Sequence, residues 1–159
     1  MNQNETIIRK LKALGFDPAD FGAMGCVFRY EGLSYLYLPD DRDEHFLRII
    51  VPNLFTVTDD NRVEVLEAMH ETGQLLKYSK VCIMYEDSVC AVYEHLYGDT
   101  EDLTDILEHM ILVLALTANV FHEKINGNEH SVSSDEPDED YDAELEAEMQ
   151  RMLENSKDE

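Results

Sequence analysis

KVCIMYEDSVCAVYEHLY, residues 80–97, contains two runs rich in β-branched and aromatic residues, separated by a short acidic break. VCIMY at 81–85 and VCAVYEHLY at 89–97 have the composition of β-strands, and the break between them has the composition of a turn. The stretch also brings together two cysteines, a histidine and three tyrosines. We predict that it folds as a β-hairpin.

The register of this hairpin depends on the length of its turn. With a two-residue turn, Cys82 faces Ala91 and Cys90 points to the other side of the sheet. With a three-residue turn, Cys82 faces Val92 and Cys90 lies diagonally across the pair. Neither register suits a disulfide, so the pattern favours alternating core residues over a reactive cluster.

The order of elements around the hairpin predicts an α+β domain. The expected arrangement is helix, three strands, helix, two strands, helix (α-βββ-α-ββ-α), with a five-stranded antiparallel sheet. Apolar periodicity, capping residues and β-rich runs indicate helices at 4–14, after 59–61 and at 101–124, and strands at 26–30, 33–38, 45–51, 81–85 and 89–97.

Both faces of the predicted sheet carry apolar residues. If the first hairpin turns at Glu31-Gly32, Phe28 faces Tyr35 and Cys26 faces Tyr37; a longer loop would shift the pairing by one residue. An antiparallel sheet is commonly solvated on one face, so the second apolar face needs a cover. A partner chain, a second subunit or the protein's own tail could supply it.

The last predicted helix is apolar around more than one face. Such a helix is buried on all sides, either at the centre of the domain or at a symmetric dimer contact. We therefore predict a homodimer or partner-binding surface formed by sheet and helix residues. The residues predicted for this surface are Phe28, Tyr30, Tyr35, Tyr37, Ile106, Met110, Val113 and Leu114.

Charge divides the chain into an α+β domain at 1–126 and an acidic tail at 127–159. The formal net charge is -23, of which 1–126 contributes 10 − 22 = -12 and 127–159 contributes 2 − 13 = -11. This charge repels phosphate backbones and anionic membranes, so we predict no binding to nucleic acid or membrane. It favours a basic or disordered segment of another protein as the partner.

The tail begins with an acidic linker and ends in a possible amphipathic helix. Its apolar residues recur at helical spacing and would lie on one face. Such a helix is either frayed in water or docked on an apolar surface. The residues predicted to dock are Tyr141, Leu145, Met149, Met152 and Leu153.

The sequence predicts no enzyme, metal site or cofactor. Cys26, Cys82 and Cys90 have no neighbouring base that would make a thiolate, and buried thiols are common. The histidines lack the spacing of metal ligands, and no Gly-rich phosphate loop is present. The less favoured alternative is an enzyme or small-ligand sensor that uses hairpin residues. Its candidate residues are Cys82, Cys90, Tyr93 and His95.

We expect no signal peptide, because no charged start is followed by an apolar core and a small-residue cleavage site. The most apolar run, 106–121, is 16 residues long and is interrupted by polar side chains, whereas a membrane helix needs roughly 20 mostly apolar residues. Three cysteines in no metal-type spacing suit a reducing compartment. We therefore expect a soluble, cytoplasmic protein.

The order of elements over about residues 4–125, with a two-sided apolar sheet in an acidic protein, resembles the type III secretion chaperone-like fold, which includes the YbjN-like bacterial proteins. The resemblance implies a homodimer that holds an extended segment of another protein, or a YbjN-like regulatory protein without a known reaction. We predict a non-enzymatic, chaperone-like interaction module.

Overall fold

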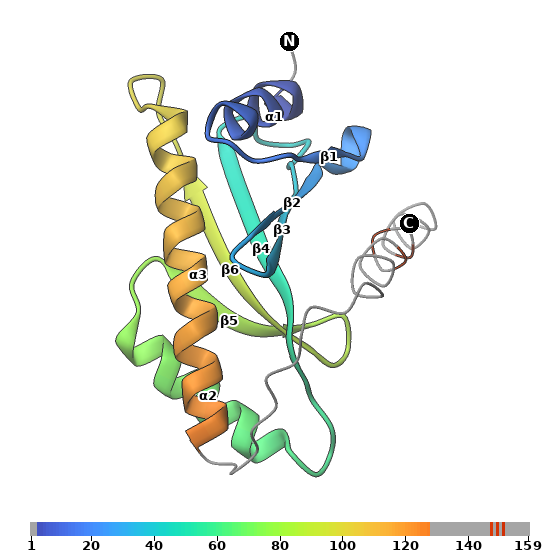
Figure 1. Ribbon diagram of the computed structural model, residues 1–159, viewed down its shortest axis with the longest axis vertical. Helices are drawn as coiled ribbons and strands as arrows, with labels where there is room; N and C mark the ends of the chain where they lie inside the picture. The colour runs from blue at the N-terminus through green and yellow to red at the C-terminus, as the bar shows by residue number, and fades with distance from the viewer. Residues whose placement is uncertain (1–2, 128–146, 148, 150, 152–159) are drawn as a thin grey trace.

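The computed structural model describes residues 3–127 and, in the C-terminal segment, Ala147, Met149 and Arg151 (Figure 1). Residues 3–127 form one antiparallel sheet and three α-helices, as predicted. The elements are α1 (Gln3–Ala13), β1 (Ala19–Asp20), the 3-10 helix η1 (Gly22–Met24), β2 (Cys26–Tyr30), β3 (Leu33–Tyr37), β4 (Phe46–Thr56), α2 (Arg62–Leu75), β5 (Ser79–Met84), β6 (Ser88–Leu96) and α3 (Leu103–Gly127).

The sheet has six strands, in the order β1-β2-β3-β4-β6-β5, so the expectation of five strands is wrong. The additional strand, β1, has only two residues, and Ala19 pairs with Val27. A two-residue strand shows no alternation that a sequence pattern could reveal, and it forms because β2 offers an open edge.

The three helices pack on one face of the sheet and form the main core with it (Figure 1). Each helix presents an apolar stripe, as amphipathic periodicity requires. The stripes consist of Ile7, Ile8 and Leu11 in α1, Val65 and Ala68 in α2, and Leu107, Met110, Ile111, Leu114, Ala118, Phe121 and Ile125 in α3.

α3 is long and apolar enough to cross a membrane by length and composition alone. It packs against α1, α2 and strands β4, β5 and β6, and its buried residues fill the main core. These contacts make it the central helix of the main core. Leu112 and Leu116, one turn apart, are about half exposed on its outer side, at 51% and 52%.

The first hairpin has the predicted register, with Phe28 opposite Tyr35 and Cys26 opposite Tyr37. Its turn is Glu31-Gly32, with φ angles of 49° and 79°. Two positive φ angles are what a type I′ turn requires, and this turn matches the twist of the strands. Glu31 adopts that conformation although glutamate is an uncommon residue there.

The second hairpin differs from both predicted registers. Met84 pairs with Ser88, and Cys82 lies directly opposite Cys90. The turn comes earlier than composition indicates, because Tyr85 and Glu86 adopt positive φ angles of 53° and 74°. The backbone carbonyl of Asp87 also accepts a hydrogen bond from the Val57 amide, at 2.7 Å. This contact with the end of β4 is long-range, so local sequence does not reveal it.

Candidate protein-binding face

We call the sheet face opposite the helices the second face. It carries a continuous row of apolar residues. Val27 in β2 is opposite Leu36 in β3, Leu36 is opposite Ile50 in β4, and Ile50 is opposite Val92 in β6. Lys80 in β5 lies at the end of the row, opposite Val92. Because side chains alternate between faces, these residues all point away from the main core.

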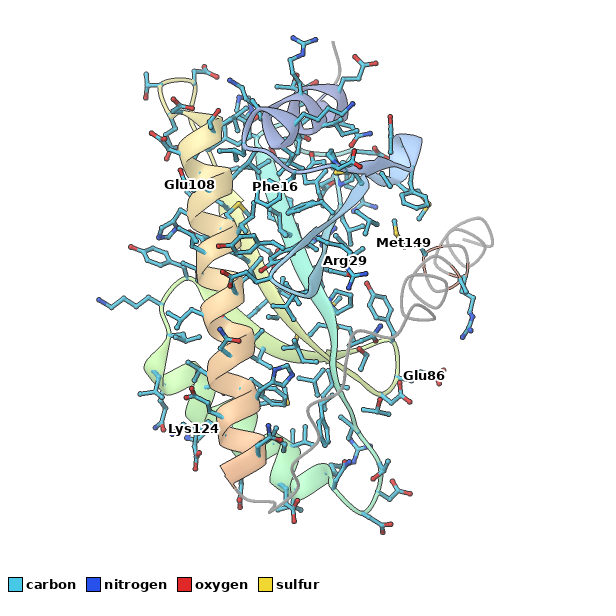
Figure 2. All side chains as sticks on the ribbon, viewed as in Figure 1. Phe16, Arg29, Glu86, Glu108, Lys124 and Met149 are labelled. Carbon is cyan, nitrogen blue, oxygen red and sulfur yellow. The ribbon has the colours of Figure 1, made fainter. Side chains whose placement is uncertain are left out.

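Leu36, Ile50, Cys90 and Val92 form a second buried cluster, separate from the main core. Its fifth member is Met149 of the C-terminal segment, which is 1% exposed. Figure 2 shows Met149 on the side of the sheet away from α3. The remaining side chains that pack against the cluster are Phe21, Val27, Leu38, Cys82 and Met84. Within residues 3–127, no helix residue takes part in this cluster.

Basic side chains border the apolar row. Arg29, Arg48 and Lys80 share the second face by alternation with Val27, Ile50 and Cys82. The acid on the strands of this face is Glu94, which pairs with the Lys80 ammonium and lies opposite Arg48. The second face is therefore locally basic, although the domain as a whole is acidic.

Two cysteines lie side by side on this face. Cys82 is partly exposed and Cys90 is buried. Burial raises the pKa of the Cys82 thiol; nearby Lys80 opposes this shift and Glu94 adds to it. A raised pKa keeps the group as a thiol at neutral pH, which disfavours nucleophilic chemistry. The two side chains here contribute mainly apolar contact.

The residues of the less favoured enzyme hypothesis do not converge. Cys82 and Cys90 lie on the second face, whereas Tyr93 belongs to the main core on the opposite face. His95 is two residues along β6 from Tyr93, and its Nε2 lies 3.4 Å from the Glu101 carboxylate. The sheet therefore separates the thiols from the tyrosine and the histidine.

The sequence gives no indication of a cluster formed by Tyr78, Tyr93 and His109. The Tyr93 hydroxyl hydrogen-bonds the His109 ring at Nδ1, at 2.9 Å, and the Tyr78 ring stacks on Tyr93 at 6.0 Å between centroids. Burial raises the pKa of Tyr93. The three residues come from a loop, a strand and a helix, so only the tertiary structure brings them together.

The sheet and helix residues predicted for the interface are mostly internal. Phe28, Tyr35, Tyr37, Met110 and Leu114 are buried in the main core, and the Phe28 and Tyr35 rings stack at 5.2 Å. The other three, Tyr30, Ile106 and Val113, are partly buried against the same core. These side chains hold helices to the sheet, and the dimer or partner interface expected from them stays a prediction.

Of the five tail residues predicted to dock, Met149 is the one that the structure describes. Tyr141, Leu145, Met152 and Leu153 lie outside the described residues. The second-face residues Leu36, Ile50 and Val92 were not predicted as a site. Alternation along the first hairpin could have identified Leu36, because the Leu36 side chain points to the other face of the sheet from the aromatic residues that the helices cover.

Exposed apolar side chains also lie on the outer side of α2. Val63 and Leu66 line a shallow groove of about 340 Å³ on α2, together with Glu67, His70 and Glu71. Among the described residues, no group of three or more His, Cys, Asp or Glu side chains is close enough to hold a metal ion.

The arrangement defines a small α+β domain with helices on one face of an antiparallel sheet and an apolar second face. The sequence matches no protein-family model and no curated protein. Two solved structures each match 79% of this chain. One is an uncharacterized protein from Methanothermobacter thermautotrophicus, with 13% identity, a TM-score of 0.58 and 98% of that chain covered. The other is YbjN from E. coli, a candidate transcription regulator, with 8% identity, a TM-score of 0.57 and 91% of that chain covered.

Identities this low show the fold alone. The predicted likeness to YbjN is confirmed at the level of fold. The likeness to type III secretion chaperones stays a prediction.

Proposed function

We propose that this protein is a non-enzymatic interaction module that binds an amphipathic segment of another protein on the second face. The observation that carries the proposal is the apolar row Val27-Leu36-Ile50-Val92, which the domain's own helices leave uncovered. A sheet face that is apolar and has no helix of residues 3–127 on it favours an interaction site, because burial of such a face is favourable. A flat sheet face suits a helix or strand better than a small molecule, because small molecules bind in concave pockets.

The charges at this face favour a partner that is acidic where it makes contact. Arg29, Arg48 and Lys80 border the row against a single acid, Glu94. Complementary charges steer association and reject like-charged partners. The prediction of a basic or disordered partner segment along the sheet came from the net charge of the whole chain and stays a prediction; the charges bordering the second face favour an acidic segment there instead.

Two features of the earlier hypothesis remain part of the proposal. The homodimer would use the outer side of α3, where Leu112 and Leu116 are exposed. The chaperone-like role in the cytoplasm would consist of holding a partner segment on the second face, without any reaction.

A YbjN-like regulatory protein is the second candidate, supported by the shared fold. With a formal net charge of -23, such a regulator would act through protein contacts and not through direct contact with DNA.

A pair of synthetic helical peptides tests the proposal. Both have the same methionine and leucine positions on one face, and they differ in carrying glutamates or lysines on the other. We expect the acidic peptide to bind the full-length protein at least about tenfold more tightly than the basic one in fluorescence anisotropy. Arg48→Glu should weaken the acidic peptide, while Arg62→Glu, on α2, should not. Failure of both peptides to bind would contradict the proposal.

A further inference from the structure

We infer that the C-terminal segment around Met149 is an intrachain occupant of the second face, which another acidic helix must displace in order to bind. This inference rests on the proposed function, because it assumes that the face accepts helices. It assigns the protein a built-in competitor for its own binding site.

The burial of the described tail residues supports a seated helix. Met149 is buried among Leu36, Ile50, Cys90 and Val92, whereas Ala147 and Arg151, two residues to either side, are exposed. In an α-helix a step of two residues turns the side chain by about 200°, so residues two positions away point to the opposite side. The helix therefore lies with the Met149 side against the sheet and the other side toward solvent.

Charge makes the segment a suitable occupant of a basic-bordered face. The sequence from 141 to 154 contains Asp142, Glu144, Glu146, Glu148 and Glu154 against a single base, Arg151. The face offers Arg29, Arg48 and Lys80 around the row that contacts Met149. Opposite charges on the two surfaces stabilise this arrangement and give it the same chemistry as the proposed partner.

The linker is long enough for the segment to reach the face of its own chain. Thirteen residues, 128–140, separate Gly127 at the end of α3 from Tyr141, where the apolar spacing of the segment begins, and such a linker can span up to about 45 Å. A tethered segment has an effective concentration in the millimolar range. A contact too weak to persist between separate chains is therefore largely formed within one chain, yet it can still be displaced.

Thiol labelling of the full-length protein measures this occupancy directly, without any peptide. Cys82 is partly exposed and packs against the cluster that contains Met149. Its rate of alkylation by N-ethylmaleimide therefore reports whether the C-terminal segment covers the second face. Cys26 is the internal control, because it is buried in the main core on the opposite face. Mass spectrometry of proteolytic fragments assigns each labelled site.

The matched variants are Met149→Asp and Ala147→Asp. Both add one negative charge to the same helix, but one replaces the buried side chain and the other an exposed one. We expect M149D to raise the alkylation rate of Cys82 by about fivefold or more, because the burial of a methionine shifts such an equilibrium by roughly a factor of ten. A147D should leave the rate unchanged, and Cys26 should stay unlabelled in both variants.

An unchanged Cys82 rate in M149D, or equal increases in both variants, would overturn the inference. Protection of Cys82 that grows with protein concentration over about a hundredfold range would also overturn it, because the occupant would then be the tail of a second copy. Tighter binding of the acidic peptide to M149D than to A147D would support the inference. If the labelling result holds and the peptide binds neither variant, the proposed function fails while the intrachain contact stands.

Discussion

Removal of the Tyr35 or Tyr37 hydroxyl should stabilise the protein. Both side chains are fully buried in the main core, and neither hydroxyl has a hydrogen-bond partner among the residues that the structure describes. A buried polar group without a partner costs about 1–3 kcal/mol of desolvation. The Tyr35 ring stacks on Phe28, and a phenylalanine would keep that contact. Part of the gain is offset, because the missing oxygen leaves a small void with lost dispersion contacts.

The expected net effect of Tyr35→Phe or Tyr37→Phe is a gain of about 1 kcal/mol in the free energy of unfolding. For a chain of this length, that gain corresponds to a rise in Tm of roughly 2–4 °C. Urea denaturation of each variant, followed by circular dichroism, measures the midpoint. The denaturant slope should stay unchanged, because the surface exposed on unfolding is the same.

Tyr93→Phe is the matched control, since the Tyr93 hydroxyl is hydrogen-bonded to His109 Nδ1 at 2.9 Å. The same deletion of one oxygen should here cost about 0.5–1.5 kcal/mol. Opposite signs for the two sites are the expected result. A loss of stability in Y35F and Y37F as large as that in Y93F would refute the reasoning, because it would mean that the core hydroxyls have partners.

Two further predictions concern a pair of glycines and the alkaline limit of stability. Gly25→Ala should destabilise strongly or prevent folding, because φ is 109° and the new Cβ would lie 1.8 Å from the Tyr37 carbonyl oxygen; Gly73→Ala, in open space on α2, should instead stabilise by about 0.5–1 kcal/mol in the same urea assay. Burial, with a smaller contribution from Asp20, raises the pKa of Cys26 from its ordinary 9.0 to about 12. The resulting stability is fully present below pH 9 and is lost as pH rises toward about 12, since the unfolded chain releases the thiol proton first. Between about pH 8 and 10.5 this group alone should remove about 2 kcal/mol, and Cys26→Ala should show a fall that is smaller by that amount; equal falls in both proteins would contradict the assigned burial.

Local pattern accounts for most of the fold. Ile7, Ile8 and Leu11 recur at helical spacing and form the buried stripe of α1, and the alternation around Glu31-Gly32 predicts the pairing of Phe28 with Tyr35. These features depend on residues close together in the chain, so the periodicities of helix and strand are sufficient to find them.

The second hairpin and the site show where local pattern fails. The turn at Tyr85-Glu86 uses two positive φ angles at residues that seldom adopt them, and a contact between Val57 and Asp87 accompanies it. That shift of register places Cys82 opposite Cys90. Sequence also indicates that both faces of the sheet are apolar, but it does not say which face the helices take.

By itself, the sequence determined the α+β class, the order of the long elements and the acidic charge, because each is a property of composition or short-range spacing. The tertiary structure decided which face is core and which carries the row under Met149. It also gathered Arg29, Arg48 and Lys80 around that row, although they are far apart in the chain. The physical reason is that strand pairing and helix packing join distant segments, and only that joining gives an acidic chain a basic-bordered face.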